Sequence, residues 1–194
     1  MGGREGLDQG VSSVTIRPST DADLEAITAI YGWNVLNGLG TFEEVPPDEA
    51  EMARRRAAFL AKGLPYLVAE QDGVVVGYAY AGPFRLRAAY RYTVEDSVYV
   101  GPDAVGKGVG KALLSALIEA CEAMGLRQMC AVIGDSGNAA SIGLHAALGF
   151  EKQGVFPAMG YKFGRWVDLV WMQRALNGGG GAPPDAPGMT LSGV

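Results

Sequence analysis

Hydrophobic residues recur along the chain with two periods, and these periods predict a succession of strands and helices. Residues 14–17 alternate between apolar and polar side chains as a strand does, and Thr20 with Asp23 has the spacing of a capping box that opens a helix. The same patterns predict further helices that begin at Pro46, Gly106 and Asn138, and strands over residues 66–70, 74–81, 92–100, 129–133, 155–162 and 167–172. This order of elements indicates a mixed α/β fold.

The two ends of the chain interrupt this pattern. Residues 1–13 are rich in glycine and polar side chains, and residues 177–194 are rich in glycine and proline. Neither segment has the apolar periodicity that burial requires, so we expect a flexible N-terminus and a disordered tail that buries nothing. A single domain is therefore expected over residues 14–176, in keeping with a chain of 194 residues.

Charge and composition restrict the functions of such a domain. The 16 basic and 21 acidic residues give a net charge of −5, and no stretch concentrates the basic ones, so we expect neither a nucleic-acid nor a membrane partner. Because His145 is the only histidine in the sequence, no multi-histidine metal site can form, and we expect no metal cofactor. Cys121 and Cys130 lie in apolar segments, as buried thiols do, and no apolar run is long enough for secretion or a membrane span. These features predict a cytoplasmic protein.

A glycine-rich turn between a strand and a helix is the strongest chemical signal. The turn from Gly106 to Gly110 would leave backbone N–H groups free at the positive end of the helix dipole, with few side chains to keep a phosphate away. Two nucleotide-binding patterns are excluded, because Gly108 stands where a Walker A loop needs Ser or Thr, and Lys111 stands where a dinucleotide-binding loop needs Gly or Ala. An anion site and a helix start without a ligand both remain open.

The turn gains meaning from the segments around it. Gly108-x-Gly110 at the head of a helix, followed by a strand and by the segment from Asn138 to Phe150, resembles the GNAT superfamily of acetyl-CoA-dependent N-acetyltransferases. Residues 80–84, 93–100 and 162–168 are similar to segments of the phosphinothricin and methionine sulfone/sulfoximine N-acetyltransferases. The resemblance implies a single GNAT-type domain whose mixed central sheet is splayed at the acetyl-CoA site and flanked by helices. It also implies a homodimer.

The same resemblance assigns residues to the coenzyme. In the superfamily the pyrophosphate lies on backbone amides of a loop that corresponds to residues 105–110, where Val105 replaces the usual Arg or Gln. The pantetheine arm pairs with the strand that precedes this loop. The residues implied for acetyl-CoA binding are Val98, Tyr99, Val100, Val105, Gly106, Lys107, Gly108, Val109, Gly110, Lys111, Asn138 and Ser141.

Two side chains are implied in the transfer itself. Glu95 corresponds to the carboxylate that takes a proton from the incoming ammonium, a role that suits a carboxylate in a partly desolvated cleft. His145 stands where many members of the superfamily carry a Tyr near the coenzyme sulfur, and an imidazole there can protonate the departing thiolate. The alternatives are a solvent-facing strand glutamate and a histidine that is satisfied by hydrogen bonds on the inner face of its helix.

The acceptor is implied by the segments next to these residues. Arg85 and Arg87, with Leu86 between them, lie where related enzymes grip a substrate carboxylate, which guanidinium groups bind in bidentate fashion. Phe42 corresponds to a wall of the acceptor pocket, although it fits a core position equally well. Together with Glu95, these residues imply direct transfer of an acetyl group from acetyl-CoA to the α-amine of a small amino acid or analogue. Acetylation of a polyamine, an aminoglycoside or a protein N-terminus remains open, as does a non-catalytic acyl-CoA-binding sensor.

Overall fold

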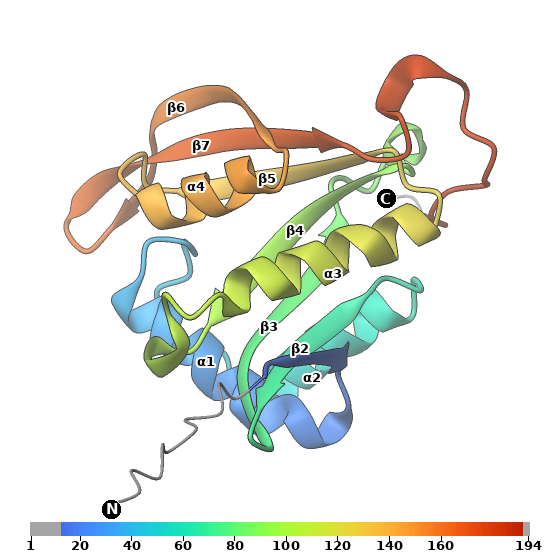
Figure 1. Ribbon diagram of the computed structural model, residues 1–194. Helices are drawn as coiled ribbons and strands as arrows, with labels where there is room; N and C mark the ends of the chain where they lie inside the picture. Colours follow the sequence, from blue (N-terminus) through green and yellow to red (C-terminus); the bar gives the residue numbers. More distant parts are fainter. Residues whose placement is uncertain (1–12, 192–194) are drawn as a thin grey trace, which may run out of the picture.

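A computed structural model describes residues 13–191, so the segment expected to be flexible lies, apart from Ser13, outside the described residues. Seven strands in this part of the chain form one sheet in the order β1-β2-β3-β4-β5-β7-β6 (Figure 1). The neighbours are antiparallel except for β4 and β5, which run parallel. The strands are β1 (Thr15–Pro18), β2 (Tyr66–Gln71), β3 (Val74–Pro83), β4 (Thr93–Val100), β5 (Gln128–Gly134), β6 (Glu151–Lys162) and β7 (Arg165–Ala175).

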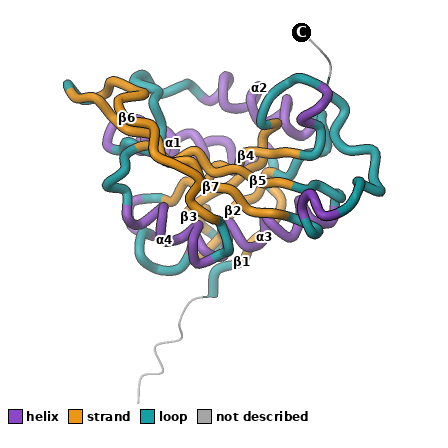
Figure 2. The backbone as a smooth tube through the Cα atoms, turned by 90° about the horizontal axis from the view of Figure 1, so that it is seen from above, coloured by secondary structure: helices purple, strands orange, loops and turns teal. Residues whose placement is uncertain are grey.

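Helices cover both faces of this sheet, which gives three layers (Figure 2). α1 (Leu24–Asn37) and α2 (Glu49–Leu60) pack on one face, and α3 (Val109–Ala123) and α4 (Ala139–Ala147) pack on the other. The predicted mixed α/β domain is therefore confirmed. Among residues 13–191, no helix is long and apolar enough to cross a membrane.

Each face of the sheet has its own hydrophobic core. The regular apolar stripe of α3, with Leu113, Leu117 and Cys121 fully buried, packs on the first face. On the other face, Ile27 of α1 packs with a group of tyrosines that includes Tyr78 of β3. The two faces thus differ in chemistry, because one is aliphatic and the other is lined by aromatic rings.

The predicted helix starts are nearly correct, and local capping explains the differences. The helices expected from Pro46 and Gly106 begin at Glu49 and Val109. Asp48 takes the first N-cap position, where its side chain accepts a hydrogen bond from an amide of the first turn, and Gly108 takes the second.

The sheet divides between β4 and β5. These strands pair only over residues 93–95 of β4 and 128–130 of β5, and beyond Glu95 they diverge. β4 nevertheless keeps its antiparallel partner β3 as far as Val100, and β5 keeps β7 as far as Gly134. The backbone polar groups of β4 that face the gap therefore have no strand partner there and can bind a ligand. This split confirms the splayed sheet that the resemblance implies.

Residues 177–191 pack against the domain, in contrast to the disordered tail predicted for residues 177–194, of which the last three lie outside the described residues. The hydroxyl of Tyr92 donates to the carbonyl of Ala186 at 2.8 Å, and the amide of Met189 donates to the carbonyl of Arg91 at 2.8 Å. Met189 is only 6 % exposed. This packing is not visible in the sequence because most of the contacts are hydrogen bonds to backbone carbonyls, and only two apolar side chains, Met189 and Leu191, pack on the core, without a periodic stripe.

Candidate active site

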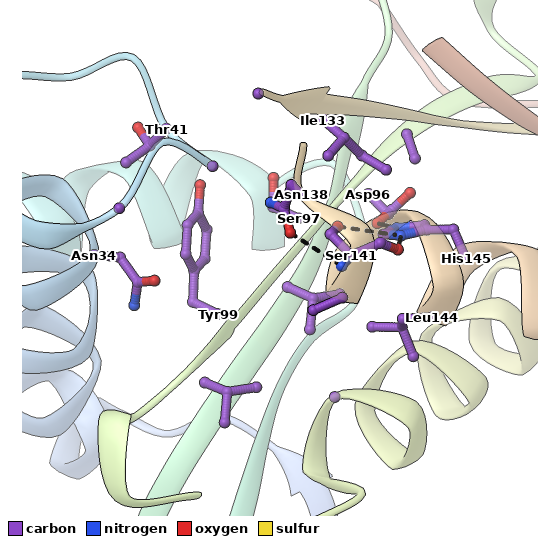
Figure 3. A pocket seen from close by; sticks show the side chains of 18 of the residues that line it. Asn34, Thr41, Asp96, Ser97, Tyr99, Ile133, Asn138, Ser141, Leu144 and His145 are labelled. Atoms are coloured by element: carbon purple, nitrogen blue, oxygen red, sulfur yellow. Dashed lines mark hydrogen bonds and ion pairs between the residues drawn. The ribbon is translucent and has the colours of Figure 1, made fainter. Parts of the chain in front are cut away.

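A cavity of about 710 Å³ opens where β4 and β5 part (Figure 3). Its walls come from the loop after α1, the outer half of β4, the end of β5, the head of α3 and the first turns of α4. The cavity therefore reaches the free edge of β4 and the N-terminus of α3 at once, which are the two places where backbone N–H groups are available.

The head of α3 is built to receive an anion. Gly106 and Gly108 have positive φ angles of 79° and 82°, which other residues adopt only with strain. Gly108 is the N-cap and offers no side chain to the first amides of the helix, and the first turn contains no acidic residue. A Cβ added at Gly110 would lie 3.3 Å from Leu144, so this glycine lets α4 approach α3 closely. The free amides and the helix dipole together favour a phosphate here.

The structure brings most of the expected coenzyme residues to the cavity. Lys107 lies in the same turn but is not part of the wall. Asn138 is the N-cap of α4, and its side-chain oxygen accepts a hydrogen bond from the amide of Ser141 at 3.1 Å. The expected residues that line the cavity are Val98, Tyr99, Val100, Val105, Gly106, Gly108, Val109, Gly110, Lys111, Asn138 and Ser141.

Glu95 lies in the cavity wall at the last paired position of β4 before the split. Successive residues of a strand point to opposite faces, so Glu95 lies on the face of Tyr99, which packs against Tyr31 of α1. The pKa of Glu95 is raised from 4.5 to about 7, chiefly by burial; the negative charge of Asp96 adds to the rise, and the positive charge of Arg85 opposes it. Near neutral pH, this half-buried carboxylate can therefore both accept and release a proton.

Asp96 points to the other face, where it meets His145 of α4 (Figure 3). Oδ2 of Asp96 lies 3.0 Å from Nε2 of the ring, and Nδ1 lies 2.7 Å from the carbonyl oxygen of Ser141. Burial lowers the pKa of His145, but the carboxylate and the carbonyl outweigh it and raise the pKa. The imidazole thus lines the cavity with both ring nitrogens engaged, which matches the alternative of a hydrogen-bonded histidine on the inner face of its helix.

The acceptor residues are only partly brought together. Phe42 lines the cavity, whereas Arg85, Leu86 and Arg87 lie in the loop after β3 and do not line it. The guanidinium of Arg85 lies 5.1 Å from the ring centre of Phe84. Its positive charge opposes the rise in the pKa of Glu95.

The sequence analysis missed several polar groups of the wall. Asp96 is buried and its Oδ1 has no hydrogen-bond partner in the described structure. Thr41 is buried as well, and its hydroxyl lies 3.0 Å from that of Tyr31. Asp96 leaves a signal in the sequence, because the alternation of the strand places this charged residue on the face opposite to Glu95, among apolar positions. Thr41 leaves no such signal.

The described part of the chain contains no cluster of side chains suited to a metal ion. Across residues 13–191, no three His, Cys, Asp or Glu side chains form a group that could hold a metal ion. Cys121 and Cys130 are free and buried, and burial raises the pKa of each thiol to about 12. Both cysteines are therefore packing residues rather than nucleophiles or ligands.

The cavity combines a gap between two parallel strands, free amides at the N-terminus of α3 and the carboxylate of Glu95, whose pKa is about 7. These features are typical of an enzyme that transfers a group from a phosphate-bearing coenzyme to a nucleophile. Residues 29–150 match the acetyltransferase (GNAT) family, and the chain belongs to this family. The acetyl-CoA-dependent N-acetyltransferase expected from the sequence is thereby confirmed.

Similar proteins extend over almost the whole chain. Phosphinothricin N-acetyltransferase of Alcaligenes faecalis is 55 % identical over 182 residues, which cover 94 % of this chain and 92 % of the relative. L-methionine sulfoximine/L-methionine sulfone acetyltransferase of Pseudomonas paraeruginosa is 49 % identical over 175 residues, which cover 88 % and 99 %. The crystal structure of a phosphinothricin acetyltransferase from Sinorhizobium meliloti in complex with AcCoA is 53 % identical, with a TM-score of 0.86 and coverage of 88 % of this chain and 92 % of that one.

Proposed function

We propose that this enzyme transfers the acetyl group of acetyl-CoA directly to the α-amine of a small amino acid or analogue of the methionine sulfone, methionine sulfoximine or phosphinothricin type. The observation that carries the proposal is Glu95, a carboxylate with a pKa near 7 at the point where the sheet splits. The named activities of the two relatives support the acceptor class.

Glu95 is the proposed base. An amine attacks a thioester only when it is neutral, so the ammonium must first lose a proton, and a carboxylate with a pKa near 7 can accept it. The new bond forms between the amine nitrogen and the acetyl carbon, and the bond between that carbon and the coenzyme sulfur breaks. No covalent intermediate with the protein is needed.

His145 is the proposed source of the proton that the departing thiolate takes up. The Asp96 carboxylate and the Ser141 carbonyl raise its pKa against the opposing effect of burial, which supports this role, but delivery requires the Nε2 proton to leave Asp96. Water can protonate a thiolate as well. The variant His145→Ala is therefore expected to lose less activity than Glu95→Gln.

The acceptor carboxylate is assigned to the loop that carries Arg85 and Arg87. This loop follows β3, whose Gly82 pairs with Glu95, and guanidinium groups bind carboxylates in bidentate fashion. Replacement of Arg85 or Arg87 by Ala should raise the KM of the acceptor far more than that of acetyl-CoA. D-enantiomers and decarboxylated amines should be poor substrates.

A screen of acceptors by mass spectrometry tests the proposal. Acetylation of L-methionine sulfone, L-methionine sulfoximine or phosphinothricin is the expected result. Strong turnover of polyamines, aminoglycosides or peptide N-termini with none of these amino acids acetylated would contradict the assignment. Binding of acetyl-CoA without turnover of any amine would favour a sensor.

We also propose the homodimer and the cytoplasmic location expected from the sequence. β6 is the edge strand of the sheet, and the hairpin that it forms with β7 exposes large apolar side chains, which supports a second copy as its partner. Two cysteines held as free thiols support a reducing compartment. The exposed apolar residues of the hairpin are Val155, Phe156, Met159, Tyr161, Phe163 and Trp166.

A further inference from the structure

Lys162, the last residue of β6, is only 1 % exposed. Lysine is among the residues least often buried, because its charge loses hydration unless a partner replaces the water. No carboxylate within residues 13–191 forms an ion pair with it; instead Nζ donates to the carbonyl oxygens of Gly38 at 2.9 Å and Thr41 at 2.8 Å. Burial lowers the pKa of the ammonium, and the charges of Glu44 and Glu43 oppose the shift.

Both acceptors of this ammonium belong to the loop that follows α1. Residues 38–42 all line the cavity, and they form its wall on the α1 side of the sheet, which is also the side of Glu95. Gly38 is the C-cap of α1, where the helix dipole is negative and attracts a cation. Lys162 thus joins the far edge of the sheet to the acceptor side of the cavity.

The rest of the loop is closely fitted to the same region. A Cβ built on Gly134 at the end of β5 would overlap the carbonyl oxygen of Leu39. A Cβ on Gly160 of β6 would lie 2.6 Å from the ring of Phe42. The two glycines therefore let the loop lie directly on β5 and β6. Among the described residues, the Lys162 ammonium is the only charged group that forms a hydrogen bond with residues 38–42.

We infer that Lys162 is a positioning residue for the acceptor, because it fixes the loop of residues 38–42 and with it the wall that faces the incoming amine. The coenzyme residues at the heads of α3 and α4 lie outside this loop, so the loss of the ammonium should leave acetyl-CoA binding intact. The inference rests on the proposed acceptor side of the cavity, but its effect on the loop does not depend on which amine is acetylated.

The test compares Lys162→Met and Lys162→Arg with Lys152→Met, a control at an exposed position of the same strand. Lys162→Met keeps an unbranched side chain, one atom shorter, and removes the ammonium, so the KM of the acceptor that the wild type uses best should rise by about tenfold or more. Calorimetry should give a Kd for acetyl-CoA within about twofold of the wild type, because the phosphate amides are untouched. Lys162→Arg should recover part of the loss, and Lys152→Met should change neither constant.

Hydrogen exchange of the free enzyme provides a readout that needs no acceptor. Amides of residues 39–42 should exchange faster in Lys162→Met, while those at the head of α3 keep their rates. If Lys162→Met does not fold, Tyr31→Phe removes the hydrogen bond to Thr41 on the other side of the loop and should raise the acceptor KM in the same selective way.

An unchanged acceptor KM together with unchanged exchange of the loop would overturn the inference, as would an equal rise in the constants for acceptor and acetyl-CoA. Failure of every amino acid in the acceptor screen would overturn only the proposed substrate class, because the exchange of the loop and the KM of any other amine would still report on Lys162.

Discussion

Glu95 and Asp96 are neighbours in sequence, and the strand directs them to opposite faces of the sheet. Asp96 is held by His145, whereas no hydrogen bond or ion pair holds the Glu95 carboxylate in the described structure. The negative charge of Asp96 therefore adds to burial in raising the pKa of Glu95. Of two adjacent acids, Asp96 is thus held by a hydrogen bond, while Glu95 has a raised pKa and suits the proposed role of base.

The raised pKa means that ionised Glu95 lowers the free energy of unfolding at alkaline pH. Because the pKa of Glu95 is raised from 4.5 to about 7 on folding, the folded state favours the protonated form, and this stabilisation is lost as the pH rises from 4.5 through about 7. Glu95→Gln stays neutral, so at pH 8 it should melt above the wild type by roughly 2–4 °C for each kcal/mol regained.

Differential scanning calorimetry at pH 5 and pH 8 measures this difference. At pH 5 the difference between the two proteins should be much smaller than at pH 8, and Glu119→Gln, at an exposed position of α3, should follow the wild type at both pH values. A Glu95→Gln protein that is less stable than the wild type at pH 8 would show that the carboxylate is not held in a desolvated site.

At the scale of elements, the turn into α3 and the split of the sheet together create the proposed coenzyme site. Gly108→Asp would place a carboxylate at the head of α3 and would strain a residue whose φ is 82°. The Kd of acetyl-CoA should rise by about a hundredfold or more, because the new carboxylate would repel the phosphates and offset the attraction of the helix dipole.

Calorimetric titration with acetyl-CoA measures the loss, and the thermal shift that the ligand causes should disappear with it. Gly143→Asp serves as the control, because a Cβ at this position on α4 meets nothing within 4 Å and Gly143 does not line the cavity. Normal binding by Gly108→Asp would place the phosphate site elsewhere.

The helices and strands are the most predictable part of this molecule. Their apolar periods are strong, as in α3, and the glycines of the turn mark the head of that helix in the sequence alone. The wall of the acceptor side was not predictable, because it depends on residues 38–42 and Lys162, which are 120 residues or more apart in sequence and meet through backbone carbonyls. A carbonyl has no residue type, so it leaves no pattern in the sequence.

The packed tail escaped prediction for the same kind of reason, and so did the identity of the groups that bind the ring of His145. Ala186 accepts a hydrogen bond through its backbone, and the Ser141 carbonyl holds one nitrogen of the imidazole. The sequence located His145 on the cavity but could not show that Asp96 would occupy its other nitrogen, because strand pairing and helix packing decide which residues of β4 and α4 face each other.

The whole molecule presents an apolar edge at β6 that a second copy is proposed to cover. Phe156 of this strand is 46 % exposed, and a charge there would have to be buried in the dimer. Phe156→Glu should therefore convert the dimer to a monomer at micromolar concentration, because an unpaired buried charge costs several kcal/mol.

Light scattering after size exclusion measures the mass of each species. Val74→Glu is the matched control, since Val74 is 62 % exposed but lies in the hairpin between β2 and β3, and it should leave the dimer intact. A wild-type chain that is a monomer at all concentrations tested would contradict the proposed assembly.

The central claim is that the molecule holds acetyl-CoA in the gap between β4 and β5 while Glu95 takes a proton from the amine. The pH dependence of kcat/KM for the best amino-acid acceptor, measured for the wild type and Glu95→Gln, tests this most directly. The wild-type value should rise with pH through about 7, as Glu95 loses its proton, and Glu95→Gln should lack this limb and be slower by roughly a hundredfold at pH 7. A Glu95→Gln enzyme that keeps the same limb at full activity would show that another group removes the proton.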